Sequence, residues 1–301
     1  MTTVVNPGKR DRLWRGVVIA TPYLWLLLFF LVPFAIVLKI SFADPLVAQP
    51  PFTAFFDWSA DAGNRVLATL DNYRFLLEDK LYLVSYLKSI KIALISTGLC
   101  LLLGFPMAYA IALTPYPWRN LLLLLVILPF WTSFLLRVYA WMVMLGKQGL
   151  INQMLMSMGL IDEPLQMLYT DGAVYLGIVY TYVPFMILPL YATLEKLDLD
   201  LHEAAADLGA RPLQVFRDVT LPLAIPGIIA GCLLVFIPAL GEYVIPALLG
   251  GLDSLMIGRT LYDEFFVNRD WPLASAVAVV LLLILILPIM LFQRLQQETD
   301  A

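Results

Sequence analysis

Six long apolar runs, separated by polar segments, set the pattern of hydrophobic and polar positions along this chain. They cover residues 17–38, 92–113, 120–145, 172–194, 219–241 and 271–293. Each run has about the 20 residues that a helix needs to cross the hydrocarbon core of a bilayer. Only the third run contains an internal charge, at Arg137. The pattern therefore predicts an all-α membrane protein with six transmembrane helices.

The composition agrees with a chain whose solvent is largely lipid. Of its 301 residues, 61% are hydrophobic and 14% are charged, whereas a soluble domain is closer to half apolar and a quarter charged. Cys100 and Cys232 lie inside apolar runs, where buried small side chains are expected rather than a disulfide or a metal site. A single histidine and the lack of a GxxxxGK[ST] phosphate loop predict no metal or cofactor on this chain.

The charges flanking the first run suggest an orientation. An even number of spans places both ends of the chain on one side of the membrane. A basic cluster at residues 9–15 directly precedes the first run, which favours a cytoplasmic N-terminus. That run is longer than the apolar core of a signal peptide, so it is expected to be retained. The prediction is a cytoplasmic tail at 1–16, a six-helix transmembrane domain at 17–293 and a second cytoplasmic tail at 294–301.

A polar island at 195–222, between the fourth and fifth runs, is too charged to cross a bilayer. Gly209 suits the left-handed position that ends a helix, and Pro212 suits the first turn of the next one. This pattern predicts a helix, a glycine turn and a second helix along the cytoplasmic surface. The first helix would expose Ala204, Ala205 and Leu208, which can seat in a groove of a partner. An ordinary amphipathic helix at the lipid interface is the alternative.

The spacing of this island resembles the EAA loop by which type I ABC-importer permeases dock on their ATPase. The matching positions are Glu203, Ala204, Ala205, Gly209, Phe216, Val219 and Pro222. From Tyr23 to about Met290 the chain also resembles the permeases of polyamine importers, most closely those for putrescine. The stretches that carry this resemblance are 121–141, 182–191, 205–213, 234–251, 254–259 and 268–278.

The resemblance implies the type I importer permease fold and a transporter subunit that is not an enzyme, in the bacterial inner membrane. The implied partners are a second homologous permease, two ATPase subunits that hold ATP and Mg²⁺, a periplasmic polyamine-binding protein and the lipid bilayer, with no nucleic acid. Putrescine is favoured as substrate, with spermidine second. Another small cation or an iron complex, or a gradient-driven carrier, is the alternative. The residues implied to couple to the ATPase are Glu203, Ala204, Ala205, Leu208, Gly209, Arg211 and Pro212.

A path for a polyamine needs carboxylates or aromatic faces for its ammonium groups. Glu242, at the end of the fifth run, is the leading candidate, with Tyr243, Trp131 and Tyr139 as aromatic candidates. Trp and Tyr also gather at membrane interfaces for reasons of lipid contact. Arg137 would repel a cationic substrate, so it is a candidate for a structural ion pair, either with Glu242 or with an acid of the partner subunit.

Overall fold

The computed structural model describes residues 9–54, 56–57, 65–66, 68–198, 200–251 and 254–299. The outermost parts of the two predicted tails, residues 1–8 and 300–301, lie outside this range. The described residues divide into two compact units. One unit draws on residues 1–78 and 264–280, and the other on residues 79–263 and 281–301.

The described part of the chain contains six helical segments that are long and apolar enough to cross a membrane. They run Gly16–Ile40, Lys80–Leu113, Phe134–Ser157, Asp171–Leu194, Pro212–Leu240 and Trp271–Met290. The strands in this part are β1 (Phe56–Asp57) and β2 (Arg65–Val66), which pair antiparallel, and Pro45 and Phe52 form an isolated bridge. The predicted helical fold with six spans is confirmed.

The first unit begins with one long helical stretch. It consists of α1 (Lys9–Leu26), the π-helical turn η1 (Leu27–Leu31) and α2 (Val32–Ile40). The side chains of residues 16–33 are exposed on this chain, as expected of a helix whose neighbours are lipid or another subunit. Helix α3 (Asp71–Glu78) is fixed to the end of α2 by Asn72, whose amide donates to the carbonyl oxygens of Ser41 and Ala43 at 3.0 and 2.8 Å.

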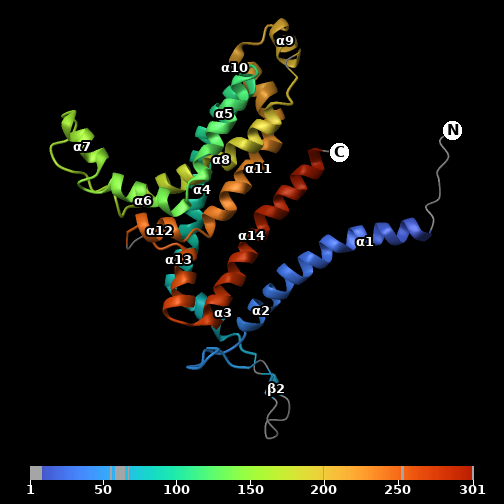
Figure 1. Cartoon of the computed structure of the whole chain (residues 1–301), viewed down its shortest axis with the longest axis vertical. Coiled ribbons are helices and arrows are strands. Elements are labelled where there is room, and N and C mark those ends of the chain that lie inside the picture. Colours follow the sequence, from blue (N-terminus) through green and yellow to red (C-terminus); the bar gives the residue numbers. More distant parts are fainter. Residues whose placement is uncertain are drawn as a thin grey trace. The chain divides into compact units, whose positions relative to one another are not determined.

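The core of the second unit is formed by three helices, α4 (Lys80–Leu113), α8 (Asp171–Leu194) and α11 (Leu221–Leu240), which pack against one another (Figure 1). Glycines allow the close approach. A Cβ atom built on Gly104 of α4 would lie 2.9 Å from the Met186 side chain of α8, and one on Gly231 of α11 would lie 2.6 Å from its Sδ. Small residues at helix contacts are typical of membrane bundles.

Helix α4 begins twelve residues before the predicted start of the second span, at Lys80 instead of 92. The side chain of Asp79 caps it by accepting the N–H of Leu81 at 2.8 Å. The extension was not predicted because it contains lysines at 80, 88 and 91. Hydropathy identifies the apolar part of a helix and not the polar turns that continue beyond it. The last helix, α14 (Trp271–Thr299), likewise continues past the predicted end at 293.

The bounds predicted for the third span, 120–145, are wrong. The structure has α5 (Trp118–Ile127), a 3₁₀ turn η2 (Leu128–Trp131) and then α6 (Phe134–Leu145), followed by α7 (Leu150–Ser157). Pro129 lies in the first turn of η2 and has no N–H to donate, and Ser133 has a non-helical backbone at ψ 136°. Proline therefore ends the first half, and the chain turns before the second.

Candidate functional site

The polar island forms the predicted helix, glycine turn and helix. Helix α9 (Asp200–Asp207) is followed by Gly209 in the left-handed region, at φ +85°, and by α10 (Pro212–Val215). The N–H of Gly209 donates to the carbonyl oxygen of Ala206 at 2.8 Å, and that of Ala210 donates to Ala205 at 3.1 Å. These two bonds are the Schellman motif, which satisfies the last carbonyl groups of a helix. In Figure 1, α9 and α10 lie together at one end of the second unit.

The second half of the loop leads without interruption into a membrane span. Pro212 is the first residue of α10, as its fixed φ predicts. The backbone N–H of Arg211 donates to Oε1 of Gln214 at 2.8 Å, which holds the turn before α10. A π-helical turn, η3 (Phe216–Thr220), then joins α10 to α11. A displacement of this half of the loop therefore acts on α11 through continuous helical backbone.

The predicted coupling residues lie on the surface of the loop. Ala205 is partly buried; the exposed ones are Glu203, Ala204, Leu208, Gly209, Arg211 and Pro212. The two leucines on either side of the glycine turn present large apolar side chains to the outside, with Leu208 90% exposed and Leu213 77% exposed. Apolar side chains grouped in a polar surface are typical of a contact with another molecule. The geometry suits a docking element.

Glu242 is buried, at 8% exposure, and its carboxylate bonds within its own chain. One oxygen accepts the backbone N–H groups of residues 243, 244 and 245 at 3.2, 3.0 and 3.4 Å. These groups open the short helix α12 (Val244–Leu249), and a negative charge is favourable at a helix N-terminus. The other oxygen accepts the hydroxyl of Tyr182, on α8, at 2.5 Å. Glu242 therefore fixes the turn between α11 and α12 to α8.

The structure does not pair Arg137 with Glu242. Arg137 is 9% exposed on α6, and its guanidinium carbon lies 5.4 Å from the ring centre of Phe130 and 6.0 Å from that of Phe134. These distances allow cation–π attraction. Its Nε and Nη1 atoms are buried and have no hydrogen-bond partner among the described residues. The alternative of an acid on a partner subunit is left open by this geometry.

Tyr243 stacks on Tyr262, at the end of helix α13 (Ile257–Tyr262), with ring centres 4.0 Å apart and planes 16° from parallel. A hydrogen bond with Tyr262 is the main reason why the pKa of Tyr243 is raised above its ordinary value, and Asp263 adds to the effect. The raised pKa keeps the hydroxyl of Tyr243 neutral, and its ring offers an aromatic face near the carboxylate of Asp263.

Trp131 and Tyr139 are both exposed on this chain, and neither makes a ring contact with Tyr243 within the described range. Of the four residues predicted for the substrate path, Glu242 and Tyr243 are joined by a hydrogen bond. Sequence reasoning missed Tyr182 and Tyr262. The first sits inside an apolar run, where a buried tyrosine hydroxyl requires a partner, and that requirement is the signal that could have drawn attention to it.

Six candidate spans and an exposed helix–glycine–helix loop agree with the membrane subunit of a transporter. A family model described as "Binding-protein-dependent transport system inner membrane component" matches residues 1–298, so the chain belongs to this family. The chain is 44% identical over 230 residues to the spermidine/putrescine transport system permease protein PotB of Escherichia coli K12, covering 76% of this chain and 83% of PotB. PotB of Haemophilus influenzae is 41% identical over 281 residues, with 93% of each chain covered.

The fold agrees with a solved structure. The chain resembles the bacterial alginate ABC transporter in complex with alginate pentasaccharide-bound periplasmic protein, with a TM-score of 0.67 and 20% identity over 97% of this chain and 96% of that one. The resemblance to polyamine-importer permeases is thus confirmed, and the chain is a permease subunit of an ABC importer in the inner membrane. The family consists of transporter subunits rather than enzymes.

Proposed function

We propose that this chain forms half of the membrane path of an ATP-driven polyamine importer, with putrescine favoured and spermidine as a second substrate. Relatives at 39–44% identity that are named spermidine/putrescine permeases support the substrate class. The proposed partners are a second homologous permease, two ATPase subunits that bind ATP and Mg²⁺, and a periplasmic polyamine-binding protein. Both termini lie in the cytoplasm in this proposal, in keeping with the basic cluster before the first span.

The observation that carries the proposal is the exposed loop formed by α9, Gly209 and α10. Its apolar leucines would seat on the ATPase, and its second half continues into α11 through unbroken helix. Closure of the ATPase subunits on ATP would move the loop and bias the spans between an inward-open and an outward-open arrangement. A two-state change of this kind needs an element that contacts both the ATPase and the membrane helices.

The stacked pair of Tyr243 and Tyr262, close to Asp263, supports a path for an organic cation. Aromatic faces and a carboxylate both attract ammonium groups. In this proposal Glu242 shapes the path by fixing the turn that carries Tyr243. Trp131 and Tyr139 would add aromatic surface to the path from α6 and the turn before it, and Arg137 would pair with an acid of the second permease.

The test is uptake of radiolabelled putrescine and spermidine into proteoliposomes that contain this chain, its partner subunits and the binding protein, with ATP present or withheld. The proposal expects ATP-dependent uptake of putrescine at a higher rate than spermidine. Hydrolysis that responds to another binding protein, without polyamine uptake, would favour a different small cation or an iron complex as the substrate.

The same preparation tests the docking loop. Glu203→Ala combined with Gly209→Pro should abolish uptake and uncouple hydrolysis, since proline cannot adopt φ +85° and lacks the N–H that Gly209 donates to Ala206. The amount of permease in the membrane should be unchanged. Full uptake by this variant would contradict the docking role.

A further inference from the structure

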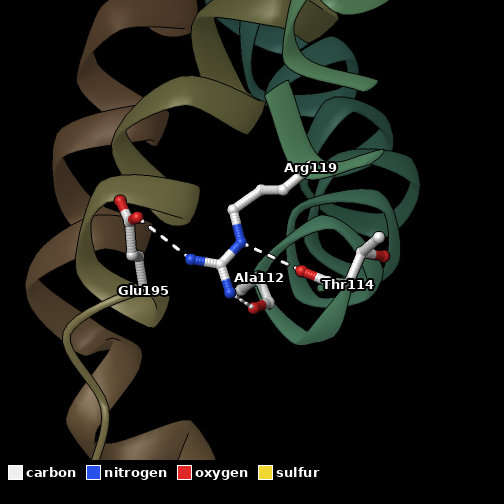
Figure 2. A network of polar contacts seen from close by, with 4 residues as sticks. All are labelled: Ala112, Thr114, Arg119 and Glu195. Atoms are coloured by element: carbon white, nitrogen blue, oxygen red, sulfur yellow. Dashed lines mark hydrogen bonds and ion pairs between the residues drawn. The ribbon is translucent and has the colours of Figure 1, made fainter. Parts of the chain in front are cut away.

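A cluster of polar contacts lies where the chain leaves α8 for the docking loop (Figure 2). Arg119, near the start of α5, directs three nitrogens at three acceptors. Nε donates to the carbonyl oxygen of Thr114 at 3.0 Å, Nη2 donates to that of Ala112 at 2.8 Å, and Nη1 bonds to Oε1 of Glu195 at 3.1 Å. The planar guanidinium suits such a set of directed bonds.

The partners of Arg119 belong to the ends of two core helices. Ala112 is in the last turn of α4 and Thr114 directly follows that helix, where carbonyl groups lack a partner within the helix and favour a cation. Glu195 is the residue that caps the C-terminus of α8, and α9 begins five residues later. Arg119 therefore joins α5, the end of α4 and the start of the docking loop.

Helix α9, the docking helix of the loop, is attached at a second point. His202, on α9, forms a 2.9 Å hydrogen bond through Nε2 with Oγ1 of Thr220, a fully buried residue directly before α11. A small cavity of about 130 Å³ lies between the two attachments and is lined by Arg119, Glu195 and His202, among others. The loop is thus attached to α4 and α5 where it begins, and it is attached next to α11 where it ends.

We propose that Arg119 is a positioning residue for energy coupling, which transmits the movement of the docking helix to α4 and α5 through Glu195. This inference rests on the proposed docking function. Without Arg119, the loop would still join α8 and α11 through the backbone, and Phe216 of η3 would still contact the rings of Phe105 and Tyr109 on α4 at 5.6 and 6.1 Å. The polar link from Glu195 to α4 and α5 would be lost. The movement of the docking helix α9 would then reach α4 and α5 through fewer contacts.

The experiment compares Arg119→Gln, Glu195→Gln and the double variant in the full transporter. The measured quantity is the number of putrescine molecules taken up per ATP hydrolysed. Each single variant should lower this ratio by roughly 2- to 30-fold, the range for residues that carry coupling between sites. The double variant should be no worse than Arg119→Gln alone, because Glu195 acts through its bond with Arg119. Arg74→Gln, which removes the exposed ion pair of Arg74 with Glu78 in α3, is the matched control.

A second readout does not depend on the substrate. Hydrogen–deuterium exchange at residues 109–119 is compared between the nucleotide-free complex and the complex trapped with ATP and vanadate. The trapped state should change the exchange in the unmodified transporter and not in Arg119→Gln. The inference would be overturned if Arg119→Gln showed the same change in exchange as the unmodified transporter. It would also be overturned if uptake and ATP hydrolysis fell together and in proportion to the yield of protein.

The two proposals fail in different ways. If Glu203→Ala with Gly209→Pro keeps the ATPase bound and active in uptake, the docking function is wrong. If that variant loses the ATPase while Arg119→Gln keeps both its coupling ratio and its exchange response, docking stands and only the role of Arg119 is wrong.

Discussion

The hydroxyl of Tyr182 donates a 2.5 Å hydrogen bond to the carboxylate of Glu242, sixty residues further along the chain. This bond joins the middle of α8 to the turn between α11 and α12. Because the other carboxylate oxygen caps α12, Glu242 organises the backbone that positions Tyr243. The finding changes what a substitution of Glu242 reports, since it affects the shape of the site as well as its charge.

Glu242→Gln should impair uptake chiefly by destabilising the turn. The amide keeps one oxygen but cannot accept from both Tyr182 and the start of α12 with a full charge, and loss of such a buried partner costs about 1–3 kcal/mol. Thermal unfolding of the purified subunit and the KM for putrescine are the measurements. A lower unfolding temperature with an unchanged KM is expected.

Tyr182→Phe is the matched control for that experiment, because it removes one donor to Glu242 and leaves the charge in place. Both variants should lower the unfolding temperature. A KM that rises in Glu242→Gln and stays constant in Tyr182→Phe would instead identify Glu242 as a direct contact of the substrate.

The loss of uptake on substitution of Gly209 should depend on how much free energy the new residue needs to adopt the left-handed backbone. A side chain in this region costs about 1–2 kcal/mol for most residues, whereas asparagine tolerates it. Apart from Gly209 and its two chain neighbours, nothing in the described part of the structure lies within 4 Å of a Cβ built there, so backbone strain and not crowding decides the result. Gly209→Asn should keep most of the uptake and Gly209→Val should lose most of it, with equal amounts of both in the membrane.

Retention of the ATPase during purification of the complex measures the same effect directly. Gly209→Val should release the ATPase and Gly209→Asn should retain it. Equal retention by the two variants would show that the left-handed turn is not required for docking.

The spans and the docking loop were predictable because their signals are local. Apolar runs report lipid contact, and Gly209 and Pro212 have backbone preferences that determine where α9 ends and α10 begins. The bounds of the third span were wrong because hydropathy does not distinguish a straight apolar helix from two apolar halves. The start of α4 was missed because it lies in a lysine-containing segment.

The contacts of the site were less predictable, because they join residues far apart in sequence. Nothing near Glu242 indicates that Tyr182 is its partner, and the expected pair with Arg137 followed from charge alone. Charge complementarity finds candidates for ion pairs, but it does not consider the backbone N–H groups at helix ends. Here such groups donate to the carboxylate of Glu242.

Gly231→Val should disrupt the packing of α11 on α8. Its Cβ would lie 2.6 Å from Sδ of Met186 and 3.2 Å from the carbonyl oxygen of that residue, so the side chain and the backbone would both have to move. Overpacking of this kind typically costs 1–3 kcal/mol. Gly98→Val on α4 is the control, since a Cβ there meets nothing within 4 Å. Thermal unfolding should separate the two variants; equal unfolding temperatures would contradict the close contact.

Arg137→Met should have opposite effects on the isolated chain and on the assembled transporter. Alone, the chain buries a guanidinium whose Nε and Nη1 are without partners in the described part of the structure, and an apolar side chain of similar length removes that cost. The variant should therefore unfold at a higher temperature than the unmodified chain.

If an acid of the second permease pairs with Arg137, less of that permease should co-purify with Arg137→Met, because the acid is then buried without a partner. Arg137→Lys keeps the charge and should retain more of the second permease than Arg137→Met. Full recovery with the Met variant would leave Phe130 and Phe134 as the partners of Arg137 and exclude the ion pair between subunits.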